Sequence, residues 1–393
     1  MRLIAFALAL AVFAPRTAWA VEGGTEDRTT TFSVAIAAGG PSSPVLRCTG
    51  TLIAPNVVLT VRHCVVAIAP GAEGCTQSFA LALGTPTDLW VAATPWADAS
   101  SLWKNVTRWV LPEQTTVCGN DIALLVLDSP FAPNEATPAT PTLTDADFRT
   151  AIRARTLGIA GFGATSAAGS GQGKRHSRFD IPVRCVPGDT SFACEGALDY
   201  IDIREFTAGA GPCTGDSGAG AISATDHDRV LGVLSRGNLQ TGTCTEGVFE
   251  RTDAWGWLLA KTVLESAAPG VIPPAWARAA FVDAPSEGAW CRGEGSCADA
   301  ADACVSFDDR RSFTCAQRCT QSFTCKAGTH CESSVCTPNG PVSSRPAPAS
   351  GCALCQRTTN DDHAVLGVIL AVLGVLRRRA TDLRDRAVEA SEP

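Results

Sequence analysis

Short apolar or alternating runs, separated by Gly, Pro and Asn, fill the chain from Val21 to about Ala267. Examples are TFSVAIAA, VVLTV, DIALLVLD, TLGIAGFG and RVLGVLS. Strand-length runs at this density, with turn residues between them, are typical of an all-β sandwich or barrel. One later segment differs: TDAWGWLLAKTVLE has apolar residues at helical spacing, with Thr252 or Asp253 as its N-cap. The pattern therefore predicts an all-β domain closed by a C-terminal helix.

The first twenty residues have the three regions of a secretory signal peptide. Arg2 gives a positive start, LIAFALALAVFA is a short apolar run, and TAWA ends in small residues. This arrangement predicts cleavage after Ala20 and export of residues 21–393.

Composition changes sharply after the β-rich region. We expect a domain at 21–268, a Pro/Ala-rich linker at 269–290 and a Cys-rich module at 291–336. A Pro/Ser-rich linker at 337–351 follows. The chain then has a segment with a Cys motif, a short apolar run and an Arg cluster at 352–379, and a charged tail at 380–393.

Charge and cysteine content narrow the function classes. The net charge of −7 and the lack of a Lys/Arg stripe before the C-terminus argue against a nucleic-acid partner. The 18 cysteines favour an oxidising compartment and disulfides. The Cys-rich module has few aliphatic residues, so we expect four disulfides to hold it together, with roughly a hundred possible pairings. A metal site with His330 as a ligand is the alternative.

A glycine-rich stretch, GPCTGDSGAG, places Asp216 and Ser217 side by side. It reads either as a tight turn or as a nucleophile whose neighbouring glycine N–H groups face a reacting carbonyl. A serine nucleophile needs a base, and that base needs an acid to orient it. His63 ends the run TLIAPNVVLTVRHC, and Asp121 opens the apolar strand of GNDIALLVLD, where a buried carboxylate needs a partner.

These three segments, LTVRHC, GNDIALL and GDSG, occur in the order His, Asp, Ser. From Val21 to Glu265 the chain thus resembles the trypsin/chymotrypsin-like serine proteases. The resemblance implies a two-barrel, all-β fold with a C-terminal helix, followed here by the small disulfide-rich module. It also implies an enzyme that acts on protein or peptide substrates without a cofactor or metal.

The resemblance assigns a role to each motif residue. His63 is the general base, Asp121 orients it and Ser217 attacks the substrate. The N–H groups of Gly215 and Ser217 form the oxyanion hole. Asp216 pairs with a new amino terminus, which here is Val21 of VEGG, directly after the expected signal cleavage and without an intervening propeptide.

The resemblance also implies disulfides and a specificity pocket. Cys48 pairs with Cys64, and Cys213 with Cys244; we further pair Cys185 with Cys194 and, by elimination, Cys75 with Cys118. The pocket falls on Gly211, Ser235, Gly237 and Gly247. Because Gly211 stands where members that prefer basic residues carry an aspartate, we expect cleavage after medium to large apolar residues.

Several positions depart from the family pattern. Arg62 precedes the histidine where a small residue is usual. Ala219 and Gly220 follow DSG where Gly-Pro is common. Arg236 stands where an aromatic residue usually lines the substrate channel. Arg236 therefore leaves the inherited subsite preferences open.

The C-terminal region resembles the sorting tags of myxobacterial surface proteins. Its apolar run, AVLGVILAVLGVL, would span about 20 Å as a helix against a hydrocarbon core of about 30 Å. In this interpretation Cys352 or Cys355 is the site of processing or lipid attachment, which puts the protein at the bacterial cell surface or outer membrane. A simple tail anchor with Arg377, Arg378 and Arg379 on the cytoplasmic side is the alternative.

The sequence as a whole predicts an exported serine endopeptidase. A protease-fold surface protein that has lost catalysis, and a tethered scaffold in which the Cys-rich module does the work, are the alternatives. Catalytically lapsed members usually lose the histidine or the serine, whereas this chain retains both. The sequence does not fix the oligomeric state.

Overall fold

A computed structural model describes residues 21–339, apart from residues 72–73, 167–168, 195, 198–199, 241–242, 282–288, 293–294, 307, 309–310 and 321–324. The expected signal peptide, most of the second linker, the sorting tag and the charged tail lie outside the described residues. No helix among the described residues is long and apolar enough to cross a membrane.

The first barrel is a closed six-stranded sheet of order β2-β3-β4-β9-β8-β7. Its strands carry the apolar runs of the first half of the domain, and β4 and β9 are buried along their whole length. Strands β5 and β6, which lie between β4 and β7 in the sequence, pair with each other as a separate small hairpin. The bounds are β2 Ser33–Ala38, β3 Val45–Ala54, β4 Val57–Thr60, β5 Val66–Ile68, β6 Phe79–Ala82, β7 Leu89–Ala92, β8 Lys104–Val110 and β9 Ala123–Leu127.

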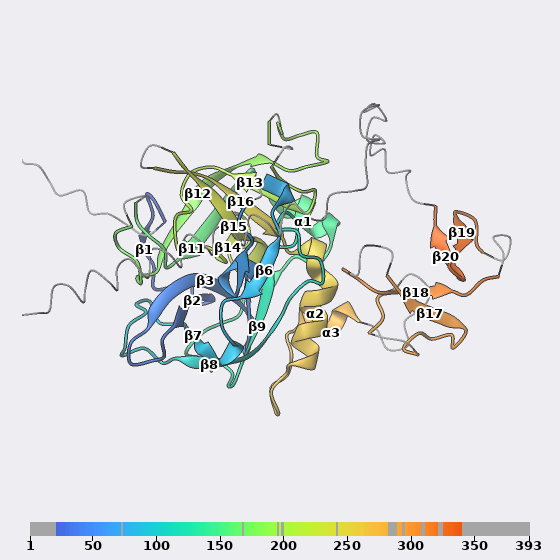
Figure 1. Cartoon of the computed structure of the whole chain (residues 1–393), viewed down its shortest axis with the longest axis horizontal. Helices are drawn as coiled ribbons and strands as arrows, with labels where there is room; N and C mark the ends of the chain where they lie inside the picture. Colours follow the sequence, from blue (N-terminus) through green and yellow to red (C-terminus); the bar gives the residue numbers. More distant parts are fainter. Residues whose placement is uncertain are drawn as a thin grey trace, which may run out of the picture. The chain divides into compact units, whose positions relative to one another are not determined.

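The second barrel follows the order β12-β11-β14-β15-β16-β13 and closes through pairing of β13 with β12. Two short strands, β1 and β10, extend it. Figure 1 shows the blue and green-to-yellow strand groups of the two barrels. The bounds are β1 Thr25–Glu26, β10 Thr140–Pro141, β11 Thr156–Gly161, β12 His176–Cys185, β13 Glu205–Ala208, β14 Gly220–Ser223, β15 Arg229–Gln240 and β16 Thr243–Arg251. The expected two-barrel, all-β fold is confirmed.

Three α-helices among the described residues accompany the barrels: α1 (Asp145–Ile152), α2 (Gly256–Glu265) and α3 (Ala275–Ala280). The expected closing helix is α2, but the expected N-cap is wrong, because neither Thr252 nor Asp253 caps it. The Thr252 hydroxyl donates to the Val230 carbonyl instead, and the Asp253 carboxylate pairs with Arg251. A turn of 3-10 helix therefore precedes α2. The segment expected as a linker contains α3, whose Ala277 is buried in the core.

The Cys-rich module consists of two hairpins, β17–β18 and β19–β20. Each hairpin is held by two disulfides that join its first cysteine to its third and its second to its fourth. The pairs are Cys291–Cys304, Cys297–Cys315, Cys319–Cys331 and Cys325–Cys336. The strands are β17 Asp302–Val305, β18 Thr314–Gln317, β19 Thr329–Glu332 and β20 Val335–Pro338. The module is thus a tandem repeat that its unequal cysteine spacing conceals.

Trp257 on α2 joins the module to the two-barrel domain. Its indole Nε1 donates to the Cys291 carbonyl at 2.9 Å, and its ring lies 4.9 Å from that of Phe313, centroid to centroid. Both belong to one compact unit that ends at Pro338.

Candidate active site

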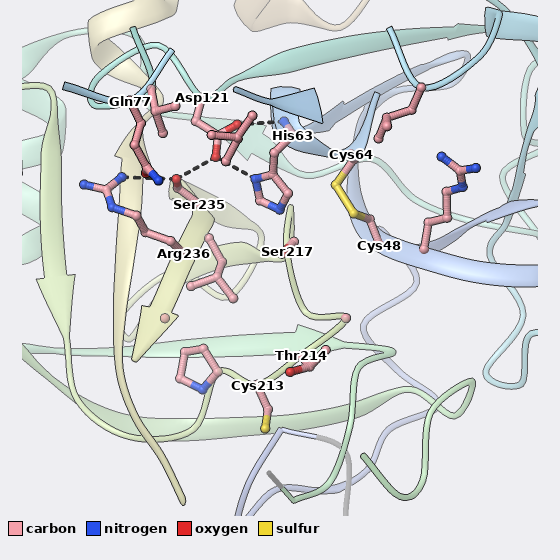
Figure 2. A pocket seen from close by; sticks show the side chains of 18 residues that line it. Cys48, His63, Cys64, Gln77, Asp121, Cys213, Thr214, Ser217, Ser235 and Arg236 are labelled. Carbon is pink, nitrogen blue, oxygen red and sulfur yellow. Dashed lines mark hydrogen bonds and ion pairs between the residues drawn. A yellow bond between two sulfur atoms is a disulfide. The ribbon is translucent and has the colours of Figure 1, made fainter. Parts of the chain in front are cut away.

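A cavity of about 590 Å³ is lined by residues of both barrels. His63 and Asp121 come from the first barrel, and Ser217 comes from the loop before β14. Figure 2 shows the three side chains together, with the His63 ring between Asp121 and Ser217. The cavity thus collects the three motif residues that lie far apart in the sequence.

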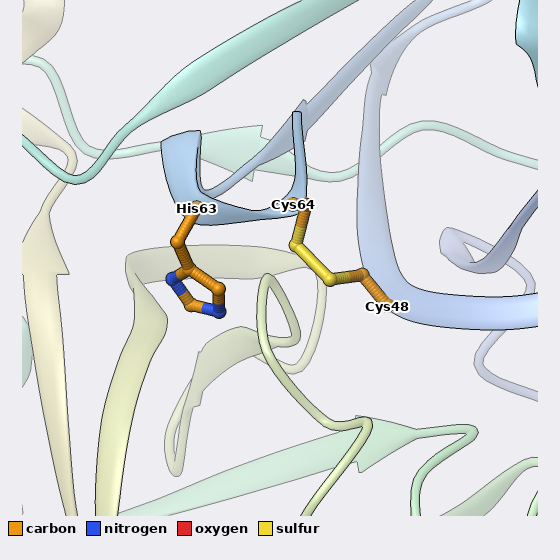
Figure 3. Close-up of side chains that lie close together, drawn as sticks. All are labelled: Cys48, His63 and Cys64. Carbon is orange, nitrogen blue, oxygen red and sulfur yellow. A yellow bond between two sulfur atoms is a disulfide. The ribbon is translucent and has the colours of Figure 1, made fainter. Parts of the chain in front are cut away.

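His63 lies on a short 3-10 helix, Arg62–Cys64, directly after β4. The disulfide Cys48–Cys64 ties this helix to β3, and Figure 3 shows it beside the His63 ring. The two sulfurs and the histidine lie within 4.8 Å of one another, a spacing that a metal site also has. Because the sulfurs are bonded to each other, they offer no thiolate ligand. The disulfide instead fixes the backbone that carries His63.

Asp121 is 1% exposed and is surrounded by donors. Its Oδ1 accepts the backbone N–H of His63 at 2.9 Å, and its Oδ2 lies 2.7 Å from His63 Nδ1. The Ser235 hydroxyl donates to the same Oδ2 at 2.6 Å. These contacts fix the imidazole ring in one orientation, as a catalytic base requires.

Burial and pairing act in opposite directions on the pKa values of this pair. Burial by itself lowers the pKa of His63, but the charge of Asp121 and its hydrogen bond outweigh burial and raise that pKa above its usual value. Burial would raise the pKa of Asp121, yet the His63 charge and the surrounding hydrogen bonds hold it below its usual value. Asp121 is therefore a carboxylate, and protonated His63 is stabilised beside it.

Glycines shape the loop that carries Ser217. Gly215 has φ +94°, and a Cβ there would lie 2.9 Å from the Gly163 Cα. Gly218 has φ +86°, and a Cβ there would collide with Thr60 Oγ1 and the Thr49 carbonyl. Larger residues are excluded from both positions by backbone conformation and by space. The amides of Asp216 and Gly218 donate to Cys213 and Leu234, whereas no described residue accepts a hydrogen bond from the amides of Gly215 and Ser217.

Asp216 is fully buried beneath this loop. It accepts hydrogen bonds from the backbone N–H groups of Gly163 and Cys213, each at 2.9 Å. Burial without a counter-charge raises its pKa to about 7. Val21 is also buried, in the core of the second barrel, and is joined to Ala20 by a peptide bond in the full chain. Within the described residues, no hydrogen bond or ion pair joins it to Asp216.

The four expected pocket residues divide into two pairs. Ser235 and Gly237 line the cavity, whereas Gly211 and Gly247 are buried and are not among its described lining residues. A Cβ at Gly247 would lie 2.9 Å from Pro212 Cγ and 3.0 Å from Leu234 Cδ1. Gly247 is therefore a close neighbour of Pro212 and Leu234, which do line the cavity.

The four cysteine pairs of the domain are Cys48–Cys64, Cys75–Cys118, Cys185–Cys194 and Cys213–Cys244, as expected.

Arg62, the unusual residue before His63, is buried. Its Nη1 donates to the carbonyls of Pro112 and Gln114, and its guanidinium lies 4.5 Å from the Phe79 ring centroid. It braces the chain that leads toward Asp121.

Sequence reasoning missed two buried carboxyl groups behind Asp121. Glu205 on β13 and Glu250 on β16 are directly opposite each other in the sheet, and both are 0% exposed. Glu250 Oε1 accepts the Asp121 backbone N–H at 3.0 Å, and Glu205 Oε1 accepts that of Gly119 at 3.1 Å. The available signal was a charged residue inside each of the strand-like runs YIDIREF and GVFER, since a buried charge needs a partner.

Residues 21–257 match the family model described as Trypsin. Because this match covers more than half of the chain, the protein belongs to the trypsin family, a family of serine proteases. A search of curated proteins found no match.

Proposed function

We propose that the protein is an exported serine endopeptidase that cleaves peptide bonds through an acyl-enzyme. The observation that carries the proposal is the hydrogen-bonded pair of His63 and buried Asp121 in the same cavity as Ser217. Family membership supports a serine protease in general.

The mechanism follows from the roles of these groups. His63 Nε2 takes the proton of the Ser217 hydroxyl as its Oγ bonds to the substrate carbonyl carbon. The carbonyl oxygen becomes an oxyanion that the N–H groups of Gly215 and Ser217 stabilise. His63 then returns the proton to the leaving amine as the C–N bond breaks. Water, deprotonated by His63, releases the acid and restores Ser217.

We propose that cleavage follows apolar residues. Pro212 and Leu234 give the cavity an apolar wall near Ser217. The only carboxylate among the described lining residues is Asp121, which is buried and already bound. A basic side chain would thus lose its hydration without gaining a counter-charge. Profiling with a peptide library tests this, and dominance of Lys or Arg before the cleaved bond would contradict it.

We propose that signal cleavage itself activates the enzyme. Cutting before Val21 would create an ammonium group next to the second-barrel core, where buried Asp216 lacks a counter-charge. Pairing of the two groups would fix the loop of Gly215 and Ser217. N-terminal sequencing of active protein should give Val21, and an active form that retains an upstream residue would contradict this.

We further propose that the protein is attached to the cell surface through residues 352–379. Measuring the mass of the mature C-terminus tests this.

Labelling with a serine-directed fluorophosphonate tests the function directly. We expect one modified peptide, containing Ser217, in folded protein and none in the Ser217→Ala variant. A Ser191→Ala variant is the matched control, because Ser191 is exposed and its hydroxyl donates to Asp189 alone among the described contacts. If folded wild-type protein is not labelled at Ser217, the hypothesis that the protein is an enzyme is contradicted. A binding protein with a protease fold then becomes the better explanation.

A further inference from the structure

The guanidinium of Arg236 lies close to the hydrogen-bonded pair of His63 and Asp121. It forms a two-pronged ion pair with buried Glu205, from Nη1 to Oε1 at 2.6 Å and from Nη2 to Oε2 at 2.9 Å. Nη2 also donates to the Tyr200 carbonyl at 2.7 Å. Planar pairing of this kind fixes both the position and the orientation of an arginine. Arg236 is therefore held in place, although it lines the cavity.

A chain of hydrogen bonds connects this guanidinium to the triad (Figure 2). Arg236 Nη1 lies 3.3 Å from Ser235 Oγ, which donates its own proton to Asp121 Oδ2 at 2.6 Å. The same Oδ2 faces His63 Nδ1. Since the Ser235 hydroxyl has only one proton, its lone pairs are what face Arg236. A positive charge thus polarises the hydroxyl that binds the triad carboxylate.

We propose that Arg236 is a positioning residue for Asp121: through the Ser235 hydroxyl it stabilises the carboxylate and opposes protonation of His63, while Glu205 holds it in place. The inference rests on the proposed function, because it assigns Asp121 and His63 their catalytic roles. It gives a purpose to an arginine at a position where the family usually has an aromatic residue.

Other charged groups around Asp121 and His63 must be weighed. Arg62 comes from the 3-10 helix of His63, Glu250 from β16, Glu205 from β13 and Arg204 from the turn before β13. Burial and the nearby carboxylates of Glu205 and Asp121 raise the pKa of Glu250 well above its usual value, which favours its neutral form. Arg204 is bound to Asp202 at 2.6 Å. Arg236 is the cation whose charge lowers the pKa of His63, and Ser235 contacts it directly.

Two neutral substitutions of equal kind separate this role from a structural one. Arg236→Gln removes a positive charge and Glu205→Gln removes a negative charge, and both retain an amide that can form hydrogen bonds. We expect the pKa of His63 to rise in Arg236→Gln and to fall in Glu205→Gln, each by roughly half a unit. Arg236→Lys, which retains the charge, should remain near wild type.

The readout is a nuclear magnetic resonance titration of the His63 ring protons in the full chain, assigned with the His63→Gln variant. It requires no activity. A wild-type protein that is not labelled at Ser217 would defeat the proposed function alone. Unchanged His63 titration, or shifts of the same sign in both variants, would overturn the inference alone.

A single substitution could prevent folding by leaving the other charge buried and unpaired. The double variant Arg236→Gln/Glu205→Gln has neither charge. Because Arg236 contacts Ser235 and Glu205 does not within the described contacts, loss of the nearer charge should still raise the pKa of His63, by less than in Arg236→Gln. An unchanged pKa in the double variant would also overturn the proposal.

Discussion

The two barrels share a strand plan but differ in what they bury. In the first barrel, β4 and β9 contribute apolar side chains such as Leu59 and Leu124, both 0% exposed. The second barrel also buries the side chains of Glu205, Asp216 and Glu250 completely. These acids do not fill its core at random, since each one accepts hydrogen bonds from backbone N–H groups near the active site.

This difference reflects which parts of the candidate active site each barrel contributes. The first barrel presents His63 and Asp121 where strands end or begin. The second barrel supplies Ser217 and also holds the first-barrel segment that carries Asp121. Glu205 binds the Gly119 amide, Arg204 donates to Asn120 Oδ1 at 3.0 Å and Glu250 binds the Asp121 amide. Buried ionisable side chains are therefore concentrated where the second barrel contacts the first-barrel segment that carries Asp121.

The largest expected effect comes from removing one catalytic group on either side. Ser217→Ala and His63→Ala should each lower kcat/KM roughly 10⁵-fold, because neither group can act without the other. The double variant should lose little more than either single variant. Steady-state kinetics on one peptide substrate measures all three, with His227→Ala, whose ring stacks on Phe179, as a control. Multiplying losses in the double variant would contradict a shared step.

The second largest loss of kcat/KM should come from Asp216→Asn, a change confined to the second barrel. The amide retains an oxygen for the Gly163 and Cys213 N–H groups but would not pair with the Val21 ammonium that the proposed signal cleavage would create. Loss of one partner from a buried ion pair costs about 3–5 kcal/mol, which corresponds to roughly 10²- to 5 × 10³-fold in kcat/KM if the conformation of the Gly215–Ser217 loop depends on the pair. Asp180→Asn, at a largely exposed side chain, should have no effect. Full activity in Asp216→Asn would show that the loop is formed without the pair.

Acid pH should lower activity through His63 of the first barrel. A general base must be neutral, so activity falls as pH drops through the pKa of His63, which Asp121 raises. The decline should begin at a higher pH than for an unpaired histidine and reach about tenfold per unit at lower pH. The kcat/KM profile between pH 5 and 8 measures it. A flat profile would remove His63 from its role.

Sequence patterns were sufficient for the parts of the site that have local signatures. The segments around His63, Asp121 and Ser217 are short motifs, and the alternating runs predicted the strands. The Glu205–Arg236 pair was not predictable, because it depends on the register of β13, β15 and β16, which are joined by long-range pairing. The predicted helix cap was wrong because both candidates have other partners: the Thr252 hydroxyl donates to the distant Val230 carbonyl, and the Asp253 carboxylate pairs with Arg251. The paired hairpins of the Cys-rich module were hidden because disulfide connectivity cannot be deduced from spacing.

The smallest expected effect tests whether the second barrel supports Asp121 by shape or by charge. Glu250 Oε1 accepts a hydrogen bond from the Asp121 backbone N–H, and burial raises the pKa of Glu250, which favours its neutral form. Glu250→Gln retains an acceptor of the same shape, so we expect activity within about threefold of wild type. Glu250→Leu leaves the buried Asp121 N–H unpaired, at a cost of about 1–3 kcal/mol. We expect roughly a tenfold lower kcat/KM and a lower melting temperature, measured by kinetics and thermal unfolding. Equal losses in both variants would mean that Glu250 acts as a charge, and equal retention would mean that the first barrel positions Asp121 without this contact.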